Sequence, residues 1–433
     1  MRTMHAHAYL PTNCSAVGAC LARGTAAMAM TPRENFKASM ERAAPKWVPL
    51  DMGKHIGSIH KKHYAALKRL LPRIDLKNDD LILDRMAQTV VPDEALLEHF
   101  GIDFRWLVPN WVQVRERADV EGYFDMWHVP YRGAHGDHFA VDTLAKAPLA
   151  DCETPEDVAA AGCWPDPEDP AQFAGLRERA RRLHETTGYV LGADAIKAGP
   201  LMSALQMRGY QQFFMDLVIN PALADAILGR ITDLLCRMWT RFMEEVGPYV
   251  QIAYVTDDLG TQTSLLLSPK VYRNRIKPFH TRLHHHIKSQ ADVYVMMHTD
   301  GAVLPLIQDL IETGADILNP VQTSTAGMQD TAALKARFGD QLRFHGAMDV
   351  QQMMPNATVA ELRWEIARRM TDLGRDGGYI IAPCHNIGHD IPPENTLAFF
   401  EMVQQMRRYP LALDEVLASG ASYFERLGRE GDA

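Results

Sequence analysis

The run Val293-Tyr294-Val295-Met296-Met297-His298-Thr299-Asp300-Gly301 decides the fold, because an apolar, β-rich stretch ends abruptly in polar residues. A short apolar run of this kind is typical of a strand that is buried on both faces. The segment that follows, Val303 to Thr313, has the length and pattern of a helix. Together the two segments predict one βα unit of a parallel sheet.

The same unit recurs along the rest of the chain. The predicted strands are Tyr189 to Gly192, Gln251 to Thr256, Val293 to His298, Asp316 to Asn319, Arg343 to Gly346 and Tyr379 to Ala382. The predicted helices are Gln211 to Glu245, Pro269 to Lys288, Val303 to Thr313, Thr331 to Phe338, Val359 to Leu373 and Glu394 to Arg407. Such uninterrupted alternation predicts a TIM-type (β/α)8 barrel.

An N-terminal elaboration is expected to precede these units. Thr31-Pro32-Arg33-Glu34 predicts a helix start, with an N-cap, a proline at the first helical position and an acid in the first turn, and the helix should run to about Arg42. Short apolar runs follow at Trp47 to Leu50 and Phe104 to Val108, then a hairpin-like stretch from Phe124 to Phe139. We therefore expect residues 30–433 to form a single catalytic domain.

Residues 1–29 are expected to form a loosely ordered extension. They are rich in alanine and contain no acidic residue. A cleaved targeting peptide is the alternative, but Pro11, Asn13 and Arg23 interrupt its apolar region.

Composition excludes several classes of protein. A formal net charge of −9 argues against nucleic acid as a partner. The sequence lacks the apolar run of about 18 residues that a membrane span needs. Six cysteines without paired spacing, in a chain too long to need disulfides, indicate a cytoplasmic protein.

Polar side chains gather where the predicted strands end. They are Asp257 and Asp258, His298 and Asp300, Asn319, His345, and Cys384-His385-Asn386. In a barrel of this type the chemistry lies at the carboxyl ends of the strands. Asp257 and Asp258 could alternatively cap the next helix. The run His284-His285-His286 lies on a predicted helix and is expected to be solvated surface.

These segments, taken as an ordered set, resemble the uroporphyrinogen decarboxylase (URO-D) superfamily. The resemblance rests on the blocks at residues 298–301, 305–310, 315–322, 344–349 and 382–387, together with Asp257 to Gln262 and the opening Thr31 to Glu34. It covers roughly residues 30 to 410. The superfamily contains true decarboxylases, and also methyltransferases that work with zinc and a corrinoid.

The resemblance is closer to the methyltransferase-like branch. The decarboxylases hold the carboxylates of their substrate with a basic loop, but the matching stretch here, Leu50 to Ile56, contains no arginine. The methyltransferases hold zinc through a His-x-Cys pair and a later Cys. The present sequence matches them at His298 and Cys384 and departs from them at Asp300, which stands in place of the first Cys.

The resemblance therefore implies a zinc site formed by His298, Asp300 and Cys384, with His385 able to replace or supplement the cysteine. Two residues apart on an extended chain, His298 and Asp300 share one side. Catalytic roles are expected for Asp257, Asp258, His345 and His385, and substrate contacts for Asp51, Asn319, Gln322 and Asn386.

The expected function is zinc-dependent methyl transfer from a small methylated substrate to a corrinoid, with a corrinoid carrier protein as a partner. A homodimer is compatible with the resemblance. The first alternative is a metal-independent decarboxylase of porphyrin metabolism, in which Asp51 or Asp258 would hold the pyrrole N–H groups. The second alternative is a non-catalytic corrinoid- or tetrapyrrole-binding protein.

Overall fold

A computed structural model describes residues 30–78, 81–110, 112–134 and 138–431 of the chain. The expectation for residues 1–29 lies outside these described residues. Residues Thr31–Ala433 form one compact unit by their internal contacts. In the described part of the chain, no helix has the length and apolar character needed to cross a membrane.

The central element of this unit is a curled parallel sheet. Its strands, each hydrogen-bonded to the next in chain order, are β4 (Phe104–Leu107), β9 (Val190–Ala193), β10 (Ile252–Thr256), β11 (Tyr294–His298), β12 (Ile317–Val321), β13 (Arg343–Met348) and β14 (Tyr379–Pro383). All six strands predicted in the second half of the sequence are present. The predicted TIM-type barrel is confirmed.

An extended segment at residues 48–51 lies between the two edge strands of this sheet. Leu50 forms a parallel bridge with Ile381 of β14, and the Ile381 amide donates to Pro49 O at 2.9 Å. On the other side, the Asp103 amide donates to Leu50 O at 2.9 Å, just before β4. The segment is thus the eighth strand of the barrel, and it ends at the buried Asp51.

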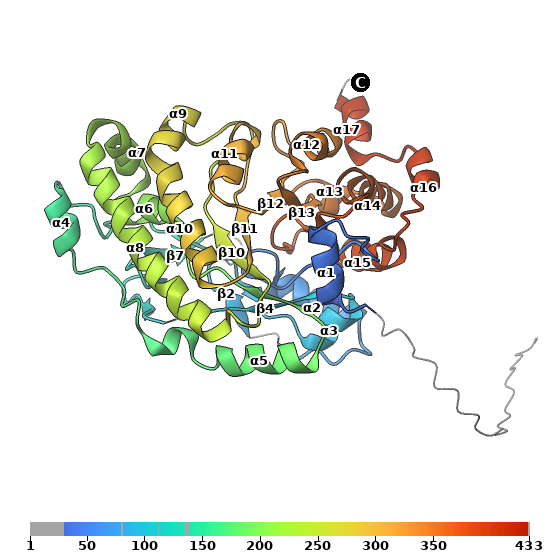
Figure 1. The fold of residues 1–433 in the computed structure, drawn as a ribbon, viewed down its shortest axis with the longest axis horizontal. Helices are drawn as coiled ribbons and strands as arrows, with labels where there is room; N and C mark the ends of the chain where they lie inside the picture. The colour runs from blue at the N-terminus through green and yellow to red at the C-terminus, as the bar shows by residue number, and fades with distance from the viewer. Residues whose placement is uncertain (1–29, 79–80, 111, 135–137, 432–433) are drawn as a thin grey trace, which may run out of the picture. The chain divides into compact units, whose positions relative to one another are not determined.

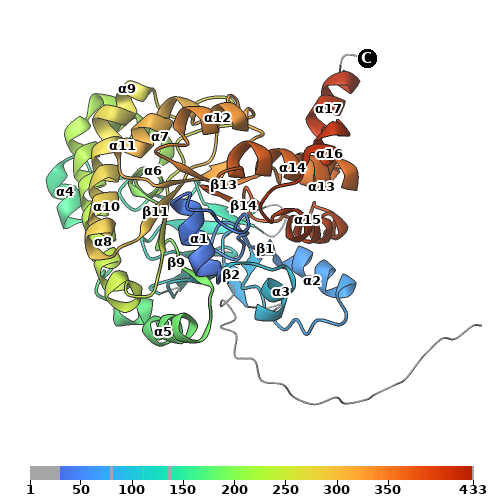
Figure 2. The same cartoon turned by 45° about the vertical axis from the view of Figure 1, so that its right-hand side comes forward.

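Helices lie around the outside of the sheet (Figures 1 and 2). Those that follow β9 are α6 (Pro200–Arg208), α7 (Tyr210–Ile219), α8 (Pro221–Val246), α9 (Pro269–Val271), η3 (Tyr272–Ile276), α10 (Lys277–Gln290), η4 (Leu304–Leu306), α11 (Ile307–Glu312), α12 (Thr331–Phe338), α13 (Met353–Asn356), α14 (Val359–Gly374), α15 (Pro393–Met406), α16 (Asp414–Ala418) and α17 (Tyr423–Gly431).

Two predicted helices are divided. The segment predicted as one helix from Gln211 to Glu245 ends at Ile219 and restarts at Pro221, because proline cannot donate within a helix but suits its first turn. The Asn220 side chain caps the new start by accepting from the Leu223 amide. The segment Pro269 to Lys288 contains five residues of π-helix before α10.

The N-terminal elaboration is larger than its sequence pattern indicates. It contains α1 (Pro32–Met40), α2 (Lys61–Leu70), α3 (Glu94–His99), α4 (Pro155–Ala160), η2 (Pro170–Phe173) and α5 (Leu176–Thr186). One antiparallel sheet pairs β1 (Ile59–His60), β3 (Thr89–Val90) and β2 (Ile82–Asp84), and a second pairs β5 (Arg115–Glu116), β6 (Gly122–Phe124), β7 (Pro130–Gly133) and β8 (Phe139–Val141). Helix α1 has the predicted start, with a complete capping box between Thr31 and Glu34.

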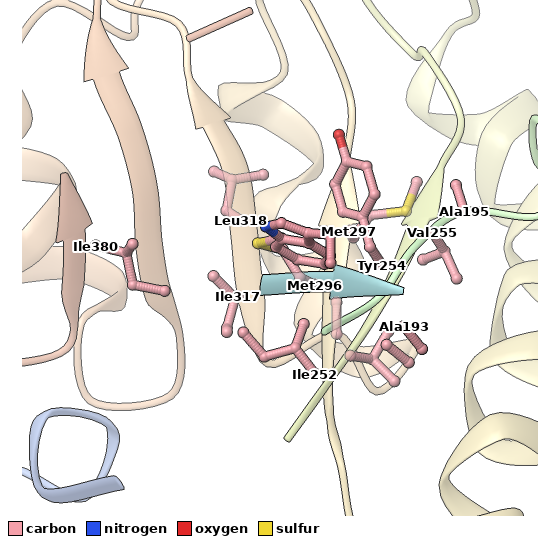
Figure 3. Packing of buried hydrophobic residues seen from close by; sticks show 14 of the residues in the cluster. Ala193, Ala195, Ile252, Tyr254, Val255, Met296, Met297, Ile317, Leu318 and Ile380 are labelled. Atoms are coloured by element: carbon pink, nitrogen blue, oxygen red, sulfur yellow. The ribbon is translucent and has the colours of Figure 1, made fainter. Parts of the chain in front are cut away.

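The barrel strands are buried on both faces, which explains why most of their residues are apolar. Every residue of β9, β10, β12 and β14 is buried. Figure 3 shows side chains from β9 to β12 packed against one another, among them Ile252, Met296 and Ile317. Polar side chains that enter this interior must therefore find partners there.

Candidate active site

Strand register brings three polar side chains side by side at the rim. Thr256 of β10 pairs with His298 of β11, and His298 pairs with Asn319 of β12. In parallel strands, residues in register that point inward lie on the same level of the barrel. The last residues of β10 and β11 and the middle of β12 therefore meet at one place.

His298 is held in one orientation by the residues beneath it. Its Nδ1 lies 2.7 Å from Asn319 Oδ1, which also accepts from the Tyr254 hydroxyl at 3.1 Å. Because an amide oxygen only accepts, Nδ1 of His298 carries the proton of this hydrogen bond. Nε2 faces two carboxylates, Asp258 Oδ1 at 3.7 Å and Asp300 Oδ2 at 3.9 Å.

His298, Asp300 and His385 form a group that suits a metal ion. One ligand atom from each lies within 4.8 Å of the others, and Asp300 Oδ2 is 3.9 Å from Nε2 of both histidines. Two imidazole nitrogens and a carboxylate oxygen are donors that zinc accepts in catalytic sites. The hydrogen bond from His298 to Asn319 is the kind of outer contact that fixes a metal-binding imidazole.

Cys384 lies apart from this group. Its thiol donates to Val321 O at 3.3 Å, and the residue is only 4% exposed. Burial raises the pKa of the thiol well above its usual value. Of the metal ligands expected from the sequence, the structure brings together His298 and Asp300, with His385 in place of Cys384.

A buried polar chain continues inward from Asn319. Its Nδ2 donates to His345 Nδ1 at 2.6 Å, and His345 Nε2 lies 2.9 Å from Asp51 Oδ2. Asp51 also accepts from Lys54 Nζ at 2.8 Å and from Trp106 Nε1 at 2.8 Å. His345 and Asp51 are thus buried behind the rim.

Charge within this chain is balanced by pairing. Burial lowers the pKa of His345 to about 4, and the Lys54 charge acts in the same direction. Burial alone would raise the pKa of Asp51, but Lys54 and His345 together hold it below its usual range. This buried polar network therefore contains the neutral imidazole of His345 beside the carboxylate–ammonium pair of Asp51 and Lys54.

The two aspartates that follow β10 have different environments. Asp257 accepts from the Leu201 and Met202 amides at 2.8 and 2.6 Å and lies 2.8 Å from His280 Nε2, so it caps α6. Asp258 is 38% exposed, and its Oδ1 accepts from the Asp300 amide at 3.0 Å. Removal from water raises the pKa of Asp258, His298 opposes this, and negative Asp300 adds to it.

Two glycines keep the acidic loops together. Gly301 has φ +101°, and a Cβ there would lie 2.3 Å from the carbonyl carbon of Gly260. The Gly260 amide donates to Asp300 O at 3.2 Å. Only glycine permits this approach, which sets Asp258 beside Asp300.

Gln322 and Asn386, for which we predict substrate contacts, accept hydrogen bonds from backbone amides in this structure. Gln322 Oε1 accepts from the Gly301 amide at 2.7 Å. Asn386 Oδ1 accepts from the amides of Gly57 and Ser58 at 2.7 and 2.9 Å. Both side chains position the loops of the site.

The prediction that His284 is solvated surface is wrong, because this side chain is 1% exposed and its Nδ1 lies 3.0 Å from Thr313 Oγ1.

A cavity of about 180 Å³ opens above His298. By the same measure one water needs about 10–15 Å³, so a small organic molecule fits. Much of its wall is apolar and comes from the elaboration, from the loops after β4 and β9 and from α6: Ile56, Met86, Val108, Pro109, Val112, Val114, Met126, Ala195, Ile196, Ala198 and Met202. The polar lining residues near the rim are Thr256, Asp257, Asp258 and His298.

Cations are scarce in this lining. Among the described lining residues there is no arginine and one lysine, Lys197. Lys197 Nζ donates to Asp125 Oδ2 at 2.5 Å and lies 3.3 Å from the Tyr131 hydroxyl. Asp125, Tyr131 and Lys197 were missed from the sequence, because only the folded elaboration places them against the rim.

Comparison with known proteins identifies the family. The family model described as uroporphyrinogen decarboxylase (URO-D) matches residues 151–406, more than half of the chain. The chain belongs to the URO-D family. The resemblance drawn from the motifs is confirmed.

Individual URO-D relatives are distant. The chain is 22% identical over 250 residues to a uroporphyrinogen decarboxylase of Psychromonas ingrahamii, covering 56% of this chain and 66% of the relative, a little under two thirds. It is 30% identical over 114 residues to one of Pseudomonas paraeruginosa, covering 26% and 30%. Among solved structures it is similar to a methyltransferase from Methanosarcina mazei, with a TM-score of 0.59, 15% identity and coverage of 87% and 99%. At that identity the similarity establishes the shared fold.

Proposed function

We propose that this URO-D family chain is a zinc-dependent methyltransferase that demethylates a small methylated compound and passes the methyl group to a corrinoid. The observation that carries the proposal is the meeting of His298, Asp300 and His385 beside the cavity, with His298 oriented by Asn319. A nitrogen–oxygen donor set is harder than a thiolate-rich one and suits an oxygen-bound methyl group.

Each residue of the site has a defined part. His298, Asp300 and His385 would hold zinc through three protein ligands and leave a position open. Zinc held there supplies Lewis acidity toward the heteroatom that loses the methyl group. Asn319 accepts from Nδ1 of His298 and so leaves Nε2 directed at Asp300. Asp258, which lines the cavity, can hold the proton that the departing oxygen takes up.

The transfer balances in atoms and electrons. The C–O bond breaks with its electron pair left on oxygen, which then takes up a proton. The methyl carbon forms its new bond with the electron pair of the reduced corrinoid, which is the second substrate. The apolar wall formed by residues such as Val114 and Ile196 binds the body of the methylated compound and excludes water.

Decarboxylation of a porphyrinogen is the second candidate, and the names of the curated relatives favour it. A substrate with many carboxylates needs several cationic partners, whereas the described lining residues offer one lysine already paired with Asp125. Asp51 is fully buried and bound to Lys54, so it does not line the described cavity.

The test is an assay of both reactions on the zinc-loaded protein. With cob(I)alamin and a panel of methyl ethers and alcohols, we expect methylcobalamin to form, seen by its visible spectrum. Asp300→Ala should abolish this and Cys384→Ser should not. Conversion of uroporphyrinogen to coproporphyrinogen would instead assign the decarboxylase. Corrinoid binding without turnover of any methyl donor would favour the non-catalytic binding protein.

A further inference from the structure

A second group of histidines lies outside the candidate active site. One ligand nitrogen from each of His60, His138 and His389 lies within 4.8 Å of the others. The ring centroids are 5.2 Å apart for His60 and His138, 4.9 Å for His60 and His389, and 6.5 Å for His138 and His389. None of the three lines the cavity described above.

We propose that His60, His138 and His389 bind a second divalent metal ion, with zinc as the ion. Three neutral imidazoles form a well-established zinc donor set, whereas calcium and magnesium require oxygen. At Zn–N distances of about 2.0–2.1 Å the three nitrogens would need to approach to roughly 3.4 Å. This approach would fall mainly on His138, which precedes β8, and on His389, which lies in the loop between β14 and α15.

His60 is the fixed member of the group. It is 1% exposed and forms the N-cap of α2, where Nδ1 accepts from the Lys62 amide at 3.2 Å. If Nε2 binds the metal, the ring proton of the neutral imidazole lies on Nδ1, which can then no longer accept from the Lys62 amide. Metal binding should therefore change the hydrogen bonding in the first turn of α2.

The three residues belong to parts of the unit that are far apart in sequence. His60 lies where β1 meets α2, His138 borders the four-stranded sheet, and His389 lies in the same loop as His385. Hydrogen bonds already join these parts to their surroundings, from the His60 amide to Ile387 O at 3.0 Å and from the Phe139 amide to Met86 O at 2.8 Å. Met86 lines the cavity. A bound ion would link the four-stranded sheet to the loop that contains His385.

The experiment counts zinc in tag-free protein that has been stripped with a chelator, reloaded and passed through gel filtration. We expect two equivalents in the wild type and in the control His99→Gln, and one in His138→Gln/His389→Gln. His298→Ala/His385→Ala should also retain one. In the protein with only the second site, cobalt(II) should give a spectrum without sulfur-to-metal charge transfer.

Equal zinc content in the wild type and in folded His138→Gln/His389→Gln would overturn the second site. Circular dichroism shows whether the variant is folded, and His389→Gln alone serves if the double variant is not. One equivalent in the wild type, retained in His298→Ala/His385→Ala but lost in His138→Gln/His389→Gln, would support the second site and refute zinc in the active site. The two proposals thus fail separately.

Discussion

Asn319 Oδ1 lies 2.7 Å from His298 Nδ1 and fixes which nitrogen of that histidine faces the cavity. The same amide donates to His345 at 2.6 Å, so one side chain joins the rim of the barrel to its buried polar chain. Orientation of a metal-binding histidine by a neighbour of this kind typically changes metal affinity by about 10–100-fold.

Replacement of Asn319 tests this orientation. Asn319→Leu removes the acceptor and should raise the dissociation constant for active-site zinc about 10–100-fold. Asn319→Asp keeps an acceptor for His298 Nδ1 and should retain zinc binding within a few-fold. Competition with a chromophoric chelator measures both constants. Equal zinc affinity in the leucine variant and the wild type would refute the role of Asn319.

Substitutions of the neighbouring residues Cys384 and His385 are expected to affect zinc binding differently. Cys384→Ser should leave zinc content and methyl transfer unchanged, because the thiol donates to Val321 O and is not part of the group formed by His298, Asp300 and His385. His385→Ala should remove the active-site zinc, because it deletes one of three ligands. Metal analysis of the two purified variants checks this. Loss of zinc in the serine variant would return the cysteine to the metal site.

The buried Lys54–Asp51 pair should matter for stability. Lys54→Met leaves the Asp51 carboxylate buried without its cation, which should lower the free energy of unfolding by about 3–5 kcal/mol. The matched control is Lys37→Met, whose partner Glu41 is also exposed, with an expected effect below about 1 kcal/mol. Urea unfolding measures both. Similar losses in the two variants would contradict the stabilising role of the buried pair.

His63 should make the protein less stable in acid. Burial lowers its folded pKa to about 4 from the ordinary value of 6.5. The unfolded chain therefore takes up this proton first, so stability falls as pH falls from 6.5 to 4, by about 3 kcal/mol in total. His63→Gln should flatten this part of the stability–pH curve in chelator-treated protein. The exposed control His99→Gln should not. An unchanged slope in His63→Gln would show that His63 titrates alike in both states.

The sequence predicts the second half of the barrel well, because β9 to β14 are buried on both faces and their apolar runs cannot be solvated. The strand at residues 48–51 and β4 are harder to predict from the sequence. About fifty residues separate the two strands, and their pairing forms only in the folded protein. Sequence pattern does not distinguish them from the rest of the elaboration.

The site was predictable as a set of rim positions but not in its individual roles. His298 and Asp300 follow from strand position alone. Whether the proposed ligand from the loop after β14 is Cys384 or His385 depends on which side chain faces Asp300. His385 faces it, whereas the Cys384 thiol is held by its hydrogen bond to Val321 O. Part of the cavity wall is formed by Asp125, Tyr131 and Lys197. Their place in the wall depends on the tertiary fold, so no local sequence pattern predicts it.

The central claim is that zinc binds at His298, Asp300 and His385. A crystal of zinc-loaded protein, with X-ray data collected at the zinc absorption edge, locates the ion directly by its anomalous scattering. We expect a peak about 2.0–2.2 Å from His298 Nε2, an Asp300 oxygen and a His385 nitrogen, and at more than bonding distance from Cys384 Sγ. A peak about 2.3 Å from Cys384 Sγ, or no peak beside His298 in protein that is fully loaded elsewhere, would contradict it.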